Sequence, residues 1–407
     1  MRRSAPLVSF CMVNRNSSET IGQCLESVAP LVDEIIVVDS GSSDDSPAIA
    51  RRFGARVIER AWTDDFAAAR NAYLRVATGR WILSLDADEV LAPCNREDLV
   101  ALIEREPDTA YRFTIRNYFL LRNFEHSLAP GEFAGCPLPG ISVTNSQTIR
   151  LFPNRRGLSY TYRIHESLMP SLQRAGCRVR DISVPIHHLG FLIGDQRIAE
   201  KFARYLDLGR RKLREHPDNP LAYLELGKLL MCAGRIEEAL ELFDACVRMA
   251  PALPNGCYYA AMARYKLGAV DECRQLIDAG LRKAPADVNL CYLLAVIDKR
   301  HQRFQKAANA FRRLADARPD HFPIQMHLAE CCVRIGELLE ADAALSKFRA
   351  LAPWHPSVYL LDAELAYQRG DRRRVEEALS EGIAAAGPCP ELLAYQDVSH
   401  ALNRVPT

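Results

Sequence analysis

The chain has 407 residues, a length that allows two or three domains. Lys and Arg number 52 and Asp and Glu number 51, so the formal net charge of +1 argues against a nucleic-acid binder. The composition, 48% hydrophobic and 25% charged, is typical of a globular protein, and the lack of any run of about 18 apolar residues argues against a membrane-spanning helix.

The amino-terminal half alternates between short apolar strands and helices. The expected strands cover 7–13, 34–38, 56–59 and 81–85, and the expected helices follow a Ser17/Ser18 cap, cover 47–53 and cover 65–77. Because the first apolar run continues into Asn14 without a small-residue cleavage site, we expect a strand there and not a signal peptide. The alternation predicts an α/β domain with a mostly parallel sheet, whose ligands bind beyond the carboxyl ends of the strands.

Unusual polar residues follow two of these strands. Asp39 opens the run DSGSSDD after the second strand, and Asp86 and Asp88 follow the strand 81–85. Neither strand leads into a glycine-rich or lysine-bearing loop of the kind that binds dinucleotides or triphosphates. Two carboxylates spaced i, i+2 at a strand end suit a divalent cation that bridges phosphate oxygens, although acidic residues also cap helices.

Five sequence blocks, in order along the chain, resemble glycosyltransferase family 2, the inverting nucleotide-sugar enzymes of the GT-A fold. The blocks are NR at 14–15, CLESV at 24–28, DEIIVVDSGS at 33–42, FAAARN at 66–71 and ATGRWILSLDADE at 77–89. The resemblance implies the GT-A fold for this domain and transfer of a sugar from a nucleotide donor.

The resemblance also implies roles for individual residues. Asp39 would bind the uridine base, Asn14 would lie near the nucleotide pocket, and Arg70 would lie close to the nucleotide or its diphosphate. Asp86 and Asp88 match the Asp-x-Asp pair that holds the ribose side and the metal, Mn²⁺ or Mg²⁺. A guanidinium and a divalent cation together offset the charge that develops on the leaving diphosphate; the other reading of Arg70 is a solvated helix residue.

The third metal ligand and the catalytic base are open to two interpretations each. His188, nearer to Gly190, is favoured over His187 as the metal ligand, and the alternative is a core histidine in a strand-end turn. Glu166 is the candidate base that takes the acceptor proton during inversion, acting with Asp88 in catalysis. The alternative for Glu166 is a helix cap.

Proline and glycine recur on a common spacing in the carboxy-terminal half. Successive prolines lie 34 residues apart at 217, 251, 285, 319 and 353, and glycines keep the same spacing at 234, 268, 336 and 370, with Gln302 at the vacant position. Each period holds two helical patterns, and small residues recur where paired helices must approach closely. This pattern resembles the tetratricopeptide repeat, with five units over 217–388 forming an all-α solenoid.

The two patterns divide the chain into four segments. We expect a glycosyltransferase domain at 1–198, a basic linker helix at 199–216, the repeats at 217–388 and a cap or tail at 389–407. The segment 120–148, rich in Gly, Pro and Ser, fits either a lid or a disordered loop. The linker carries six basic residues that could steer an acidic acceptor: Lys201, Arg204, Arg210, Arg211, Lys212 and Arg214.

Three further blocks connect the two halves to one group of enzymes. IRLFPN at 149–154, RIHE at 163–166 and HHLG at 187–190 resemble a family 2 subgroup with carboxy-terminal repeats. That subgroup is similar to bacterial lipopolysaccharide-core glucosyltransferases and to sublancin-type peptide S-glycosyltransferases. We therefore expect a metal-assisted, inverting transferase that moves a sugar, glucose or N-acetylglucosamine, from a UDP-sugar to a glycan or peptide acceptor.

Two other functions compete with this one. A repeat scaffold could bind nucleotide sugar in its front domain without turnover, but the intact Asp39, Arg70 and Asp-x-Asp pair favour an enzyme. A nucleotidyltransferase would carry a glycine-rich, lysine-bearing loop where this chain has Asn14-Arg15-Asn16. The repeat groove is expected to hold a peptide or a protein partner, unless the repeats only brace the catalytic domain.

Cysteine usage bears on the cellular compartment. The chain has 13 cysteines and no Cys-x-x-Cys pair, so neither a zinc site nor a disulfide framework is indicated. Free thiols fit a reducing compartment. We expect a cytoplasmic protein, or one peripheral to the inner membrane.

Overall fold

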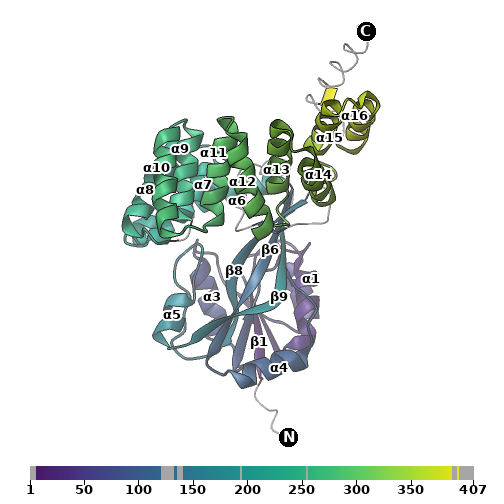
Figure 1. Cartoon of the computed structure of the whole chain (residues 1–407). Coiled ribbons are helices and arrows are strands. Elements are labelled where there is room, and N and C mark those ends of the chain that lie inside the picture. Colours follow the sequence, from purple (N-terminus) through teal and green to yellow (C-terminus); the bar gives the residue numbers. More distant parts are fainter. Residues whose placement is uncertain are drawn as a thin grey trace. The chain divides into compact units, whose positions relative to one another are not determined.

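A computed structural model describes residues 6–120, 133–134, 141–192, 195–253, 255–386 and 392–393. The chain forms two compact units, one from 1–119 with 145–233 and one from 120–144 with 234–407. Figure 1 shows that the first contains the sheet and the second consists mainly of paired helices. The predicted combination of an α/β domain with an all-α repeat region is confirmed.

A mixed sheet, with strand order β3-β2-β1-β4-β8-β6-β9-β5, forms the first unit, and β7 pairs with β8. The strands are β1 (Val8–Asn14), β2 (Glu34–Asp39), β3 (Arg56–Glu59), β4 (Trp81–Ser84), β5 (Glu89–Leu91), β6 (Thr109–Leu120), β7 (Phe133–Ala134), β8 (Ile141–Pro153) and β9 (Arg178–Phe191). The first four strands in this order are parallel to one another, whereas β8 joins β4 and β5 joins β9 antiparallel. Asn14 pairs with Asp39 in the β1–β2 register, so the polar carboxyl ends of these strands meet at one edge.

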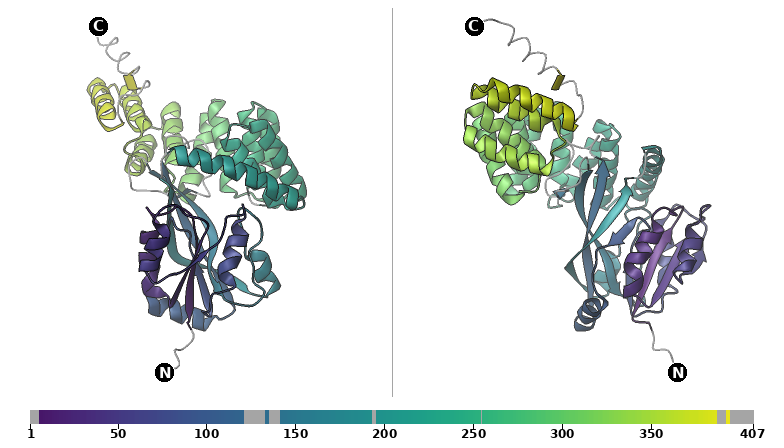
Figure 2. Two further views of the ribbon diagram at one scale, coloured as in Figure 1. Left: turned by 180° about the vertical axis from the view of Figure 1, so that it is seen from behind. Right: turned by 90° about the vertical axis from the view of Figure 1, so that its right-hand side faces the viewer.

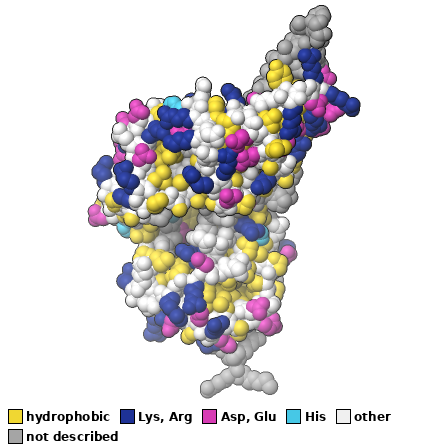
Figure 3. Space-filling model, viewed as in Figure 1, with side chains coloured by type: hydrophobic (Ala, Val, Ile, Leu, Met, Phe, Trp, Pro, Cys, Tyr) yellow, Lys and Arg dark blue, Asp and Glu magenta, His cyan; other side chains and the backbone are white. Residues whose placement is uncertain are grey.

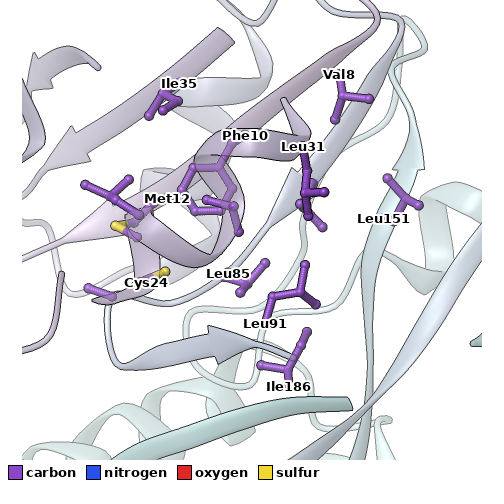
Figure 4. Packing of buried hydrophobic residues seen from close by; sticks show 14 of the residues in the cluster. Val8, Phe10, Met12, Cys24, Leu31, Ile35, Leu85, Leu91, Leu151 and Ile186 are labelled. Carbon is purple, nitrogen blue, oxygen red and sulfur yellow. The ribbon is translucent and has the colours of Figure 1, made fainter. Parts of the chain in front are cut away.

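Helices cover both faces of the sheet, on opposite sides in Figure 1. One face packs on α1 (Ile21–Val28), α2 (Ser46–Arg52) and α4 (Arg96–Arg105), and the other on α3 (Phe66–Leu74) and α5 (Met169–Arg174). Side chains alternate along β1: Phe10 and Met12 enter the first core, seen in Figure 4, and Cys11 enters the second. Full burial of a Phe or Met side chain stabilises the fold by about 1.5–3 kcal/mol, so these side chains anchor the strands that lead to the candidate site.

Helix starts show where local prediction succeeded and failed. The expected Ser17/Ser18 cap of α1 is wrong: the N-cap is Thr20, with no side-chain cap, and the Ser17 carbonyl accepts the Ile21 N–H at 2.9 Å. Helix α3 begins at Phe66 after Asp65, whose carboxylate accepts the Ala68 N–H at 2.8 Å. In the segment 120–148, residues from Ile141 on belong to β8, and 121–132 and 135–140 lie outside the described residues.

A long helix, α6 (Asp195–Glu215), and a run of shorter ones follow the sheet (Figure 2). The shorter helices are α7 (Pro220–Cys232), α8 (Ile236–Met249), α9 (Gly256–Lys266), α10 (Val270–Lys283), α11 (Val288–Arg300), α12 (Phe304–Ala317), α13 (Phe322–Ile335), α14 (Leu338–Leu351), α15 (Pro356–Gln368) and α16 (Arg372–Ala386). The small residues of the period are buried, as Ala261 and Ala295 illustrate.

The recurring glycine has a backbone reason. Gly234, Gly268, Gly336 and Gly370 all adopt left-handed φ values between 75° and 81°, and Gln302, at the vacant position, has φ 59°. A side chain is strained in that conformation, so glycine is favoured at the turn inside each period. No helix in the described part of the chain is long and apolar enough to cross a membrane.

Candidate active site

A pocket of about 510 Å³ lies beyond the ends of β2 and β3, lined by Asp39, Gly41, Ser42 and Arg60 among others. The Asp39 carboxylate is 4% exposed and accepts four hydrogen bonds. Asn14 Nδ2 donates to it at 2.8 Å and the Ser42 hydroxyl at 2.6 Å, and the backbone N–H groups of Gly41 and Ser42 complete the set. These bonds fix Asp39 at the pocket and join it to Asn14, another of the residues predicted to lie near the nucleotide.

Charged side chains of alternating sign form a network beyond β4, in the order Glu166, Arg70, Asp86, Arg150 and Glu89. Arg70 Nε donates to Glu166 Oε1, and its Nη2 donates to Asp86 Oδ1 at 2.5 Å. Arg150 Nη2 donates to Asp86 Oδ2 at 2.8 Å and to Glu89 Oε1 at 2.5 Å. Both oxygens of Asp86 are therefore occupied by guanidinium groups.

Burial makes this network electrostatically strong. The Arg70 side chain is 5% exposed, donates to the Ser84 hydroxyl at 3.2 Å and lies over the Tyr160 ring, so it is not a solvated helix residue. Burial alone would raise the pKa of Asp86, but Arg150 and Arg70 hold it well below its usual range. Burial, with the nearby Asp86 charge, raises the pKa of Glu89 despite Arg150. Three carboxylates thus share two fixed cations.

Asp88 and His188 form a separate pair. His188 Nε2 lies 3.3 Å from Asp88 Oδ2, and its Nδ1 lies 2.8 Å from Asn117 Oδ1, which orients the ring toward Asp88. Although burial lowers the pKa of His188, the hydrogen bond to Asp88 and its charge raise it. The chain thus brings together the second residue of the Asp-x-Asp motif and the favoured histidine.

The histidines lie within a strand and not in the strand-end turn expected as their alternative setting. Both belong to β9, where His188 stands opposite Glu89 of β5. Because successive side chains of a strand point to opposite faces, His187 turns the other way, and its Nδ1 lies 2.8 Å from the Tyr118 hydroxyl. The preference for His188 over His187 agrees with this geometry.

The Asp88 carboxylate and the His188 ring are placed where they could supply two ligand atoms to a divalent metal. Metal–oxygen and metal–nitrogen bonds of about 2.0–2.2 Å place neighbouring ligand atoms about 3 Å apart, close to the 3.3 Å seen here. Asp86 is less suited, since both its oxygens accept from arginines. In the part of the chain that the structure describes, the one compact group of three candidate ligands is Cys332, Glu337 and Glu340, and Arg312 already binds both of those carboxylates.

Two residues of the network were missed by sequence reasoning. Glu89 and Arg150 stand inside blocks that carried the family resemblance, yet neither was assigned a role. Arg150 lies on β8, between apolar neighbours, where its side chain is 8% exposed. An arginine directly between two apolar residues, Ile149 and Leu151, was the available signal, because a buried guanidinium requires carboxylate partners.

Comparison with known proteins agrees with the two-part architecture. The model of the glycosyl transferase family 2 matches residues 9–155, and that of the tetratricopeptide repeat matches 200–254 and 292–356. Among solved structures, a crystal structure of YrrB, described as a TPR protein with an unusual peptide-binding site, aligns with 48% of this chain and 98% of its own, at 15% identity and a TM-score of 0.40.

Curated relatives carry related descriptions. A TPR repeat-containing protein of Synechococcus elongatus is 35% identical over 57% of this chain and 54% of its own length. The SPbeta prophage-derived glycosyltransferase SunS of Bacillus subtilis is 24% identical over 59% and 53%, and an uncharacterized glycosyltransferase of Rickettsia felis is 38% identical over 21% and 30%. The chain thus spans about half or less of the length of these relatives.

Proposed function

We propose that this chain, in which a family 2 glycosyltransferase domain is followed by tetratricopeptide repeats, transfers a sugar from a UDP-sugar to a glycan or peptide acceptor with inversion. Glucose and N-acetylglucosamine are the proposed sugars, and Mn²⁺ or Mg²⁺ the proposed metal. The observation that carries the proposal is the shared edge of the sheet, where the Asp39 pocket follows β2 and both the arginine network and the Asp88–His188 pair follow β4.

The pocket at Asp39 is the proposed site of the uridine. Four donors hold its carboxylate in place, which gives the pocket a fixed negative wall. Arg51 and Arg60 also line the pocket and offer positive charge to an anionic ligand. Asn14 Oδ1 is buried, and no residue in the described ranges gives it a hydrogen bond; a bound nucleotide is the proposed donor.

The diphosphate is proposed to lie between the pocket and the Asp88–His188 pair. Those two side chains would hold the metal, which acts as a Lewis acid toward the diphosphate oxygens when bound. Arg70 and Arg150 add fixed positive charge at the same edge, where negative charge develops on the leaving group. Asp86, with a side chain 36% exposed, is proposed to accept from the ribose hydroxyls and not to bind the metal.

Glu166 remains the proposed base, and it is also proposed to hold Arg70 in position. Its Oε1 accepts from Arg70 Nε, and the described part of the chain provides no hydrogen bond to its Oε2. One oxygen therefore positions Arg70, and the other is left to accept the acceptor proton. The competing role is positioning alone, in which Glu166 only holds Arg70.

One experiment separates transfer from the scaffold alternative. The purified chain is incubated with UDP-glucose, UDP-N-acetylglucosamine and other sugar nucleotides, with and without Mn²⁺, and both melting temperature and UDP release are followed. An enzyme gives metal-dependent stabilisation together with slow donor hydrolysis, because water replaces a missing acceptor. Stabilisation with no UDP release, even with candidate acceptors present, would favour a binding scaffold.

The proposed compartment is the cytoplasm, and the proposed partner of the repeats is a protein or peptide. No disulfide joins the cysteines of the described ranges, which supports a reducing, cytoplasmic compartment. On the face seen in Figure 3, basic and acidic side chains are intermixed over the repeat helices. A mixed surface favours a protein or peptide partner in the repeats over a polyanion.

A further inference from the structure

A buried lysine of α6 lies beneath the segment that carries Glu166. The side chain of Lys212 is 2% exposed, and its ammonium donates to the carbonyl of Ile164 at 3.1 Å and to Glu225 Oε2 of α7 at 2.7 Å. A longer contact of 3.5 Å reaches the carbonyl of His165. The ammonium also lies 4.6 Å from the centre of the Tyr162 ring. All three donors of the lysine are thereby used, as burial of a charge requires.

The segment 161–167 needs such support. Thr161 and Ser167 close it by exchanging backbone hydrogen bonds of 3.0 and 2.9 Å. Inside the closure, Tyr162 has φ 74° and His165 has φ 49°, both in the left-handed region that non-glycine residues rarely adopt. Such residues persist where the surrounding structure holds them. Lys212 binds the two carbonyls that directly precede Glu166.

A second contact ties the same segment to α6 and to α3. Arg163 Nε donates to Glu215 of α6 at 2.6 Å, and the Arg163 carbonyl accepts the N–H of Phe66 at 2.9 Å. Phe66 is the first residue of α3, the helix that carries Arg70 one turn later. The segment therefore links α6 to both partners of the Glu166–Arg70 ion pair.

Similar contacts occupy three of the six basic residues expected in the linker helix. Arg204 binds Asp64 at 3.2 Å and lies over the Trp62 ring, and Arg211 binds Asp64 at 3.6 Å. Together with Lys212, these basic residues pair with groups of their own unit. These three residues anchor α6 to the sheet domain.

We propose that Lys212 is a positioning residue for the transfer reaction. Through the carbonyls of Ile164 and His165 it holds the segment 161–167 in the conformation in which Glu166 binds Arg70. Glu225 provides the opposite charge that makes a buried lysine stable at this place. The first repeat helix, α7, is thereby part of the catalytic unit, whereas later repeats contribute nothing to this contact. The claim that Lys212 affects sugar transfer rests on the proposed function, whereas the claim that it supports the segment 161–167 does not.

Two variants of the full chain test the inference. Lys212→Met removes the ammonium but keeps the length of the side chain, and leaves Glu225 without its partner. Lys212→Met with Glu225→Gln removes both charges, so that the repeat contact is neutral and the fold is kept. Arg214→Met is the matched control, because Arg214 is an exposed cation on the same helix.

Two readouts separate this inference from the proposed function. Hydrogen exchange of backbone amides in 159–168 is expected to become about tenfold faster or more in both Lys212 variants, while amides of β1 stay unchanged. Turnover of the UDP-sugar is expected to fall about tenfold, with KM within about twofold and wild-type kinetics in the control. Unchanged exchange and unchanged turnover in the double variant would overturn the inference. If the wild type turned over no sugar nucleotide, the proposed function would fail, and the exchange readout would still decide whether Lys212 holds the segment.

Discussion

Gly190 of β9 lies so close to Asp88 that a Cβ built on it would stand 2.0 Å from Asp88 Oδ2. The same Cβ would stand 2.8 Å from His188 Nε2. Gly190 is not among the residues with positive φ, so a Cβ here would act through the two side chains that it displaces and not through backbone strain. A side chain at this position would therefore push apart the two proposed metal ligands, Asp88 and His188.

Gly190→Ala should therefore abolish metal-dependent donor binding. The added methyl group displaces the Asp88 carboxylate, so Mn²⁺ should no longer increase the thermal stabilisation by UDP. The measurement is the melting temperature with UDP, with and without Mn²⁺. Gly22→Ala is the control, because a Cβ there meets only one atom, at 4.0 Å. A metal-dependent shift of wild-type size in Gly190→Ala would show that the pair does not bind the metal.

Asp88 and Asp86 should respond differently to substitution. Asp88→Ala should remove the metal-dependent part of UDP binding and leave the fold intact. Asp86→Asn should instead destabilise the domain by about 2 kcal/mol, because it removes the charge that two buried arginines share. Urea unfolding and UDP titrations with and without Mn²⁺ distinguish the two effects. If Asp86→Asn lost metal-dependent UDP binding to the same extent as Asp88→Ala and the domain kept its stability, Asp86 would be a metal ligand after all.

Glu166→Gln tests whether this residue is a base or only a holder of Arg70. The amide oxygen of glutamine can still accept from Arg70 Nε but no longer takes a proton at neutral pH. Turnover should therefore fall by about 10²-fold or more, and UDP affinity should change little. A fall of less than about threefold would assign Glu166 to positioning alone and place the base elsewhere.

Local sequence patterns predicted the fold and the first members of the site, but not the connections between them. The strands and the Asp-x-Asp motif could be found because strand periodicity and short-range spacing are properties of neighbouring residues. Arg150 and Lys212 could not, since their partners lie 61–64 and 13–48 residues away and only tertiary packing brings them together. The strand-end turn, given as the alternative setting of the histidines, was wrong because both lie within β9, where Gly190 allows the close approach of Asp88.

Stability of the repeat half should depend on a buried carboxylate. The Asp298 side chain is 2% exposed and binds Arg274 at 2.9 Å, Lys306 at 3.2 Å and Arg303 at 3.3 Å. Although burial raises the pKa of Asp298, Arg274 and Lys306 bring it below its usual range. Since the folded pKa is depressed, the stabilisation is present above the unfolded pKa near 3.9 and is lost as pH falls below it.

Asp298→Asn should then lower the free energy of unfolding by about 2 kcal/mol at pH 7 and by much less near pH 3. Chemical denaturation at the two pH values measures the difference. Asp278→Asn, at an exposed position of α10, is the control and should change little at either pH. A loss of stability in Asp298→Asn that is the same at both pH values would contradict the charge-based account.

The repeats should divide into a part that braces the catalytic unit and a part that recognises the acceptor. A chain ending at Ala233 keeps α6, α7 and the Lys212–Glu225 contact, all within the first compact unit. Donor hydrolysis should stay within about threefold of the full chain, while transfer to the true acceptor should fall at least tenfold.

A chain ending at His216 provides the comparison. It lacks α7 and Glu225, so Lys212 would lose its charged partner and hydrolysis should fall as well. Hydrolysis and acceptor transfer are measured side by side for both truncations, with circular dichroism to establish that each is folded. If the folded chain ending at Ala233 transferred sugar to the acceptor as fast as the full chain, α8 to α16 would have no part in recognition. If it lost hydrolysis and transfer equally, the later repeats would act as a brace, and the acceptor would have to be recognised by the sheet domain itself.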